Sequence, residues 1–225
     1  MTTRNKLTLR IDDLLTCEPL NNIQSQFFSG WKNKDIHILH GVAGTGKTFI
    51  SVYKALENVL DKQFKYDRLV IIRSAVPSRD LGHLPGDADE KMAAYEEPYV
   101  EICKDLFNRW DAYSRLKEQG KIQFAATSFL RGLTFDKSIV LVDEVQNMNY
   151  TELYTVMTRI GMGSKVVFCG DYRQADLKDS GLNKFMNIIN LMPSVGRYEF
   201  NIEDIVRSDI VKDFIIASLK YEDGS

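Results

Sequence analysis

The sequence is poor in cysteine: Cys17, Cys103 and Cys169 are the three cysteines among 225 residues, and they are far apart. Without a CxxC pair or a histidine cluster, neither a disulfide framework nor a zinc site is expected, and a reducing cytoplasm fits best. Long apolar runs are missing as well. No stretch approaches the roughly 18 apolar residues of a membrane span, and the N-terminus has no apolar signal core. We therefore expect a cytoplasmic protein that is neither exported nor inserted in a membrane.

An excess of charge of one sign is also missing. Lysine and arginine number 29 against 31 acidic residues, which gives a formal net charge of -2. This near balance predicts no general attraction to polyanions, although it is compatible with a local basic strip. With 44% hydrophobic and 27% charged residues, the composition is typical of a globular protein. The length suits one α/β domain with short appendages at most.

Apolar, β-branched segments alternate with longer segments of helical periodicity. Strands are predicted at 35–40, 68–73, 121–126, 138–143, 165–170 and 196–200. Such nearly continuous apolar runs are typical of strands buried on both faces of a parallel sheet. The alternation predicts an α/β fold with a mostly parallel sheet and helices on both faces. Residues 74–91 form the longest irregular stretch, which is too long for an idle connection.

The segment "GVAGTGKTFI", residues 41–50, carries the strongest chemical signal. It satisfies the pattern G-x-x-x-x-G-K-[ST], directly after a predicted strand and before an amphipathic helix. Its glycines let the backbone approach phosphates, and the helix N-terminus adds free N–H groups. Lys47 is expected to reach the β- and γ-phosphates, and the Thr48 hydroxyl to bind Mg²⁺. The predicted nucleotide-binding residues are Gly41, Val42, Ala43, Gly44, Thr45, Gly46, Lys47, Thr48 and Phe49. A glycine-rich turn that binds no ligand is the alternative.

Two acids end another predicted strand in "SIVLVDEVQNMN". Asp143 follows four apolar residues, so its carboxylate is expected at the carboxyl edge of the sheet, where ligands of such folds bind. There Asp143 would hold Mg²⁺ through water beside Thr48, and Glu144 would polarise an attacking water. The alternative is a pair of acids that caps a helix.

The segment "KVVFCGDYRQADL" supplies a further polar residue after a strand. Gln174 is predicted to hydrogen-bond both the γ-phosphate and the attacking water, and so to distinguish ATP from ADP. The G-D-x-x-Q pattern is weak by itself. Its place after a P-loop and a pair of acids in one sheet makes it a strong signal.

Together these segments resemble the PhoH-like ATPases, phosphate-starvation-inducible proteins related to the RecA-like motor core of superfamily 1 helicases. The resemblance runs from about residue 19 to about residue 218, which leaves 1–18 as an N-terminal extension of a single domain over 1–225. Its most diagnostic parts are the L-G-x-L-P-G-D segment, Leu81 to Asp87, and "TRIGMGSKVV", because generic P-loop proteins lack both. If the chain is encoded by a phage, the expected location is the host cytoplasm.

The resemblance implies a RecA-like core in which the strand before Gln174 lies between the P-loop strand and the Asp143 strand. It also implies Mg²⁺-dependent ATP hydrolysis. In "NNIQSQFF", Gln24 matches the family's adenine-reading glutamine, whose amide could bond N6 and N7 of adenine together. The alternative for Gln24 is a solvated polar residue at the start of an amphipathic helix.

A superfamily 1 motor has two RecA-like cores, whereas this chain holds one. The resemblance therefore implies a homo-oligomer, most simply a ring such as a hexamer, in which a neighbouring subunit completes each site with an arginine in trans. Such an arginine is worth about 10³–10⁵ in rate. Arg207 in "EDIVRSDI" is the first candidate for this catalytic role, before Arg173 and Arg131. The alternative for Arg207 is a surface ion pair with Glu203 or Asp204.

Binding of RNA or single-stranded DNA rests mostly on the resemblance. Helicase relatives grip the nucleic-acid backbone after the second strand, where this chain has Arg73, Arg79 and His83. Eight acids against two lysines between residues 80 and 105 predict an acidic outer or subunit-facing surface there. Phe129 and Tyr172 are aromatic residues that could stack on bases, but both are interpreted as core residues.

The main interpretation is an ATPase coupled to RNA or single-stranded DNA. An ATP-dependent switch or assembly scaffold, which remodels nothing, is the alternative. A small-molecule kinase is disfavoured, because the paired acids and Gln174 aim at water rather than at an acceptor hydroxyl. Stimulation of ATP turnover by nucleic acid separates the first two.

Overall fold

The computed structural model describes residues 8–74, 88–171 and 181–223. Several residues of interest lie outside these ranges, and their predicted roles stay predictions: Arg79, His83, Tyr172, Arg173, Gln174 and the segment Leu81 to Asp87.

The described residues form a six-stranded sheet in the order β3-β2-β4-β5-β1-β6. The strands are β1 Ile36–Gly41, β2 Arg68–Arg73, β3 Ile122–Ala126, β4 Ser138–Val142, β5 Lys165–Gly170 and β6 Val195–Phe200. Every pairing of neighbouring strands is parallel. All six predicted strands are thus confirmed to within a residue or two at each end. The strand that leads to Gln174, β5, lies between the P-loop strand β1 and the Asp143 strand β4, as the resemblance implies.

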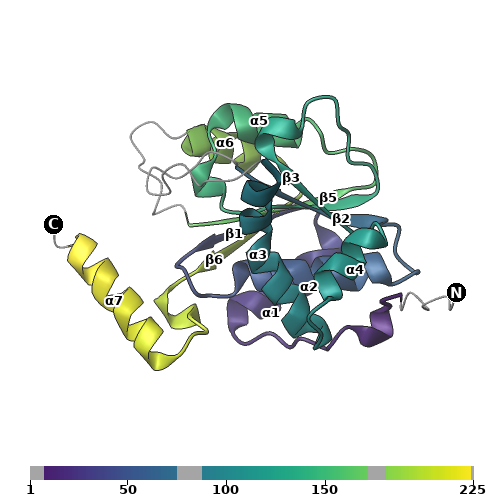
Figure 1. Cartoon of the computed structure of the whole chain (residues 1–225). Helices are drawn as coiled ribbons and strands as arrows, with labels where there is room; N and C mark the ends of the chain where they lie inside the picture. The colour runs from purple at the N-terminus through teal and green to yellow at the C-terminus, as the bar shows by residue number, and fades with distance from the viewer. Residues whose placement is uncertain (1–7, 75–87, 172–180, 224–225) are drawn as a thin grey trace, which may run out of the picture.

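Helices cover both faces of this sheet (Figure 1). The helices are α1 Asn22–Gly30, α2 Lys47–Leu60, α3 Ala88–Phe107, α4 Ala112–Glu118, α5 Tyr150–Met157, α6 Gly181–Asn190 and α7 Asp209–Asp223. Residues of α1 to α4 share one buried cluster, and residues of α5 and α6 share the other. Among the residues described, none of the helices is both long and apolar enough to cross a membrane.

The alternation of side chains along each strand explains the two clusters. In β2, Leu69 and Ile71 pack with α1 to α4, whereas Val70 and Ile72 pack with α5 and α6. All four side chains are fully buried, and each such burial stabilises the fold by roughly 1.5–3 kcal/mol. This is why the strand reads as a continuous apolar run rather than an alternating one.

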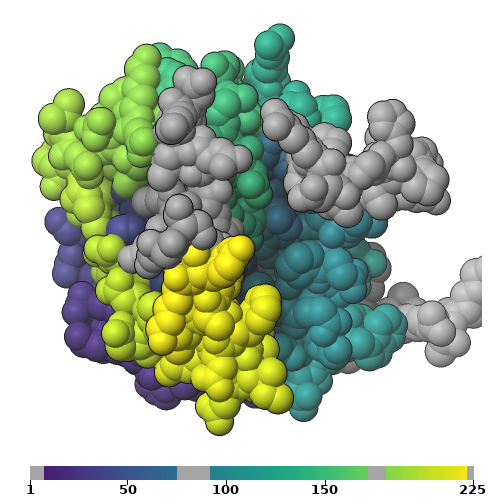
Figure 2. Space-filling model, turned by 90° about the vertical axis from the view of Figure 1, so that its left-hand side faces the viewer, coloured from purple at the N-terminus to yellow at the C-terminus, as the bar shows by residue number. Residues whose placement is uncertain are grey.

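The C-terminal helix α7 projects from this packed body (Figure 1), and Figure 2 shows the same helix from its outer side. Its outer face exposes Ile210, Phe214 and Tyr221 at 83%, 73% and 79% of their surface. On its other side, Ile215 lies 3.4 Å from the position that a Cβ on Gly44 would take. The helix therefore touches the P-loop with one face and presents apolar side chains to solvent with another.

One predicted core residue is on the surface. Phe129 belongs to the 3-10 helix η3, Thr127–Phe129, and 64% of its surface is exposed. The interpretation as a core residue is wrong, because η3 follows β3 at the carboxyl edge of the sheet, beyond the layer of side chains between sheet and helices.

Candidate nucleotide-binding site

The P-loop connects the end of β1 to the start of α2. Gly44 and Gly46 have φ angles of +76° and +80°, which side chains rarely tolerate, so these two positions favour glycine. The loop is fastened to the C-terminal part of the chain by backbone hydrogen bonds of 3.0 Å: Val42 N donates to Phe200 O and Val206 N to Gly44 O. Its shape thus depends on β6 and the turn that follows.

Lys47 lies at the first position of α2 and curls back over the loop. Its ammonium Nζ donates to the carbonyl oxygens of Gly41 and Val42 at 2.9 and 2.8 Å, and to Thr45 Oγ1 at 3.3 Å. Burial lowers the pKa of Lys47, while nearby acids including Asp171 oppose that shift. Phosphate oxygens would replace these neutral acceptors with charged ones, and hydrogen bonds to ionised acceptors are stronger.

Asp143 and Thr48 meet at the carboxyl edge of the sheet. Thr48 Oγ1 donates to Asp143 Oδ1 at 2.9 Å, and the hydroxyl of Tyr99 donates to Asp143 Oδ2 at 2.8 Å. Asp143 is 4% exposed, and this burial, together with the charge of Glu144, raises its pKa, against the hydrogen bonds and the positive charge of Arg73. A buried carboxylate beside a hydroxyl fits a hard divalent cation such as Mg²⁺, which prefers oxygen ligands.

Glu144 follows in the left-handed region, with φ at +55°, which costs backbone energy and is common at functional sites. Gln146 Nε2 donates to its carboxylate Oε2 at 2.5 Å, and Gln146 Oε1 accepts from the backbone N–H of Asp171 at 3.1 Å. A side chain at Gly170 would place its Cβ 2.5 Å from Gln146 Oε1. Gln146 therefore ties Glu144 to the end of β5, and Gly170 makes room for it.

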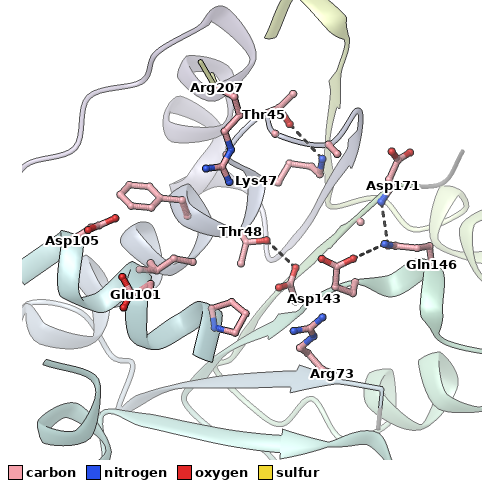
Figure 3. A pocket seen from close by; sticks show the side chains of 18 residues that line it. Thr45, Lys47, Thr48, Arg73, Glu101, Asp105, Asp143, Gln146, Asp171 and Arg207 are labelled. Atoms are coloured by element: carbon pink, nitrogen blue, oxygen red, sulfur yellow. Dashed lines mark hydrogen bonds between the residues drawn. The ribbon is translucent and has the colours of Figure 1, made fainter. Parts of the chain in front are cut away.

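These groups face a common cavity of about 540 Å³ (Figure 3). The predicted residues that line it are Ala43, Gly44, Thr45, Gly46, Lys47, Thr48, Phe49, Asp143, Glu144 and Arg207. Gly41 and Val42 contribute through the carbonyl oxygens that bind Lys47. A P-loop, a helix N-terminus, a lysine and a hydroxyl–carboxylate pair around one cavity fit a phosphate chain with a divalent cation.

Arg207 lines this cavity within its own chain (Figure 3). Its Cγ lies 3.1 Å from the position of a Cβ on Gly44. Arg207 therefore reaches the cavity of its own P-loop, and its supply to a neighbouring subunit stays a prediction. The reason for its place is tertiary: the turn after β6 folds back over the P-loop, which the sequence does not reveal. Arg131 is exposed and is not among the residues that line the cavity.

Gln24 lies beneath the P-loop and is 1% exposed, so the alternative of a solvated residue is wrong. Its amide Nε2 donates to Thr45 O at 3.0 Å, and its Oε1 accepts from Leu20 N at 2.8 Å. It also lines a second cavity of about 480 Å³, which shares Gly46, Phe49 and Arg207 with the first. The contact with adenine stays a prediction.

The structure adds residues that the sequence reasoning missed or assigned elsewhere. Arg73, which follows the second strand where helicase relatives grip nucleic acid, lines the cavity of about 540 Å³, and so do Glu101 and Asp105 of α3. The acidic helix is therefore not only an outer surface. A contact of Arg73 with nucleic acid stays a prediction. Gln146 could have been noticed two residues after Glu144, but nothing local marks Tyr99, which is 44 residues away from Asp143.

A comparison with known families identifies the chain. The family model described as "PhoH-like protein" matches residues 16–218. The chain belongs to this family. The PhoH-like protein of Synechocystis sp. is 34% identical over 206 residues, which cover 90% of this chain and 62% of the relative. Protein PhoH of Escherichia coli (strain K12) is 34% identical over 193 residues, 84% of this chain and 54% of the relative. The chain thus spans between about half and three fifths of these relatives' length.

Among solved structures, the large terminase from a thermophilic bacteriophage is similar in fold. Its complex with ADP has a TM-score of 0.52 at 14% identity and covers 87% of this chain, which spans 49% of the terminase. A second crystal form gives 0.54 at 15% identity with the same coverage. At such identity the likeness shows the RecA-like fold alone.

Proposed function

We propose that the chain hydrolyses ATP in a Mg²⁺-dependent reaction. One observation carries this proposal: the ammonium of Lys47, the Thr48–Asp143 pair and the carboxylate of Glu144 face one cavity at the N-terminus of α2. A site for phosphate binding alone would not require a strained acid beside the cation-binding pair. A kinase is disfavoured, because the paired acids Asp143 and Glu144 are suited to an attacking water rather than to an acceptor hydroxyl.

Each of these residues has a role in the proposed reaction. Lys47 and the free N–H groups of α2 bind the β- and γ-phosphates, and Glu144 orients and polarises the attacking water. Thr48 and Asp143 would hold Mg²⁺, which neutralises charge that develops on the phosphate oxygens. Arg207, which lies beside Gly44 of the P-loop, adds positive charge to the cavity. Gln174 is proposed to contact the γ-phosphate and the water, as its sequence pattern predicts.

The second cavity is the proposed place of the base. It opens beside Gly46 and Phe49, next to the phosphate cavity, and Gln24 lies in its wall. The amide of Gln24 has a second N–H and a second lone pair for adenine beyond the bonds it makes within the protein.

Release of phosphate from ATP tests the reaction. We expect turnover with Mg²⁺, none with EDTA, and a large loss in Arg207→Ala with ATP binding retained. Phosphate release that is equal with Mg²⁺ and EDTA, or absent altogether, would contradict the proposed function.

We further propose that hydrolysis is coupled to RNA or single-stranded DNA. Phe129 and Tyr154 expose 64% and 56% of their surface, and their elements η3 and α5 pack beside each other. Exposed aromatic rings with a cation nearby, here Arg131, suit stacking on unpaired bases. This surface starts directly after Ala126, the residue of β3 that pairs with Arg73 of the nucleotide cavity.

Stimulation of ATP turnover by single-stranded oligonucleotides tests this coupling. Phe129→Ala and Tyr154→Ala should weaken stimulation and leave basal turnover unchanged. Trp110→Ala, which removes an aromatic side chain 81% exposed elsewhere, is the matched control. Absence of stimulation in the wild type would favour the switch or scaffold instead.

We also propose a homo-oligomer, such as a ring, with α7 in its interface. The exposed Ile210, Phe214 and Tyr221 support this, since an amphipathic helix that stands apart gains most of its stability from packing. Light scattering of Phe214→Ser should show dissociation, whereas Met162→Ser, 85% exposed elsewhere, should not. Because Arg207 lines its own cavity, mixing Arg207→Ala with Lys47→Ala subunits should restore no turnover. Restored turnover would support an arginine supplied in trans after all.

A further inference from the structure

Both oxygens of the Asp143 carboxylate have a hydrogen-bond donor, and one of these donors comes from outside the nucleotide-binding motifs. Thr48, at Oδ1, belongs to the P-loop motif. Tyr99, at Oδ2, comes from the middle of α3 and is 0% exposed. The phenol ring packs beside Phe124 of β3, with ring centres 6.0 Å apart, so only its hydroxyl reaches the edge of the cavity.

We propose that Tyr99 is a positioning residue, which aims the carboxylate of Asp143 at the metal site and ties it to helix α3. This inference rests on the proposed Mg²⁺-dependent function. A carboxylate can rotate about its side-chain bonds, and a donor fixed at Oδ2 leaves Oδ1 turned toward the Thr48 hydroxyl. Partners that orient a ligand in this way are worth about 10–100-fold in metal affinity.

The same face of α3 reaches the site at several points. Tyr95, one turn before Tyr99, lies under the guanidinium of Arg73, whose Cζ is 5.9 Å from the ring centre. Ile102, three residues after Tyr99, lines the cavity. Residues three and four apart lie on one side of a helix, so α3 presents one continuous surface to Arg73, Asp143 and the cavity. A shift of α3 along its axis would therefore break the hydrogen bond at Oδ2 and release the carboxylate.

A second tyrosine of this region provides a control that distinguishes positioning of Asp143 from packing of the phenol ring. Tyr113 of α4 is 5% exposed, and its hydroxyl donates to Glu96 of α3 at 2.6 Å. This is also a hydrogen bond from a phenol to a carboxylate in which α3 takes part, but Glu96 is not among the residues that line the cavity. Tyr113→Phe is thus a matched control for Tyr99→Phe.

The first experiment measures binding of a fluorescent ATP analogue across a Mg²⁺ titration and in EDTA. Tyr99→Phe should bind the analogue in EDTA like the wild type, which also shows that it is folded. Its half-saturating Mg²⁺ concentration should rise by about tenfold or more. Tyr113→Phe should lower the melting temperature and leave the Mg²⁺ titration unchanged. A Tyr99→Phe titration within twofold of the wild type, or an equal shift in Tyr113→Phe, would overturn the proposal.

The second experiment needs no substitution. Amide hydrogen exchange of α3 in the wild type should be slower with a non-hydrolysable ATP analogue and Mg²⁺ than with the analogue in EDTA, while α4 stays unchanged. Equal exchange in both conditions would overturn the link to α3. A wild type that releases phosphate from ATP equally with Mg²⁺ and with EDTA would overturn the proposed function itself. Normal wild-type behaviour with an unaffected Tyr99→Phe would remove the positioning role alone.

Discussion

Two lysines, the half-buried Lys47 and the buried Lys165, lie at opposite ends of the sheet and make similar bonds. At the carboxyl edge, Lys47 Nζ donates to the carbonyl oxygens of Gly41 and Val42. At the other end, Lys165 Nζ donates to Trp31 O at 2.9 Å and to Lys34 O, and it approaches His37 Nε2 at 3.4 Å. Burial lowers the pKa of both, that of Lys165 to about 8.

The surroundings of the two ammonium groups differ. Lys165 is 3% exposed and lies 5.2 Å from the ring of Trp31, which in turn stacks on His37. Lys47 instead faces a cavity that also holds the Asp143 and Glu144 carboxylates. A buried ammonium on backbone carbonyls is therefore not by itself a functional site. Lys165 also lines a cavity, of about 420 Å³, together with Asp35. The P-loop around Lys47 and the paired acids Asp143 and Glu144 in its cavity therefore distinguish the lysine proposed to bind phosphate from the one that packs at the end of the sheet.

Replacing each lysine should give the largest change in turnover and should distinguish phosphate binding by Lys47 from packing by Lys165. Lys47→Ala should abolish turnover and weaken ATP binding, because the β- and γ-phosphates lose their fixed cation. Lys165→Met should leave turnover at the wild-type level in the folded protein and change the melting temperature instead. Phosphate release and thermal unfolding of both variants check this. Wild-type turnover in Lys47→Ala would contradict the proposed nucleotide function. Lost turnover in folded Lys165→Met would contradict a purely structural role of Lys165.

At the carboxyl edge of the sheet, Glu144→Gln should lower turnover by about 10²–10⁴-fold, the usual effect of losing a general base. The amide keeps the shape of the side chain but cannot accept a proton. ATP and Mg²⁺ binding should persist, which calorimetric titration can measure. Loss of binding with an unchanged residual rate would instead make Glu144 a metal or structural residue.

At the opposite end, the neutral His37 predicts a pH effect on stability. Burial first, and then the charge of Lys165, lowers the pKa of His37 to about 3. Between about pH 6.5 and that value, the unfolded chain takes up a proton here that the folded chain does not. Stability should therefore fall with decreasing pH, by up to about 1.4 kcal/mol per pH unit from this group.

His37→Phe tests this effect, because phenylalanine can keep the stacking between Trp31 and Tyr198 without titrating. Denaturant unfolding of the variant should depend less on pH between about 6 and 4 than that of the wild type. Lys165, with its pKa of about 8, adds no slope in this range. Parallel pH profiles for both proteins would show that the acid sensitivity arises elsewhere.

The smallest effect is expected at the base cavity. Gln24→Ala should raise KM for ATP more than KM for GTP, because only adenine offers the matched donor and acceptor. It should also destabilise the fold by roughly 1–3 kcal/mol, since Thr45 O and Leu20 N lose their partner. Steady-state kinetics with both nucleotides decide between the roles. Equal changes for ATP and GTP would make Gln24 a support of the P-loop only.

Much of the fold and part of the site could be predicted from local patterns. The six strands, the helix after the P-loop and the placement of Asp143 after β4 follow from hydrophobic runs and short motifs. Such signals are local: continuous apolar residues need burial on both faces, and glycine at positions 44 and 46 permits positive φ. Phe129 shows the limit of such local predictions. An aromatic residue is predicted to be buried whether or not another element covers it in the fold.

The sequence by itself determined the parallel sheet and the family, through patterns that run along most of the chain. It also pointed to Lys47, Thr48, Asp143 and Glu144, since each of these stands in a short local motif. Only the tertiary structure decided that Arg207 lies over its own P-loop, that Gln24 is buried beneath it, and that Tyr99 holds Asp143. These contacts join segments many residues apart, and their formation depends on how the turn after β6 and the helix α3 pack on the sheet. No local preference of the chain encodes that packing.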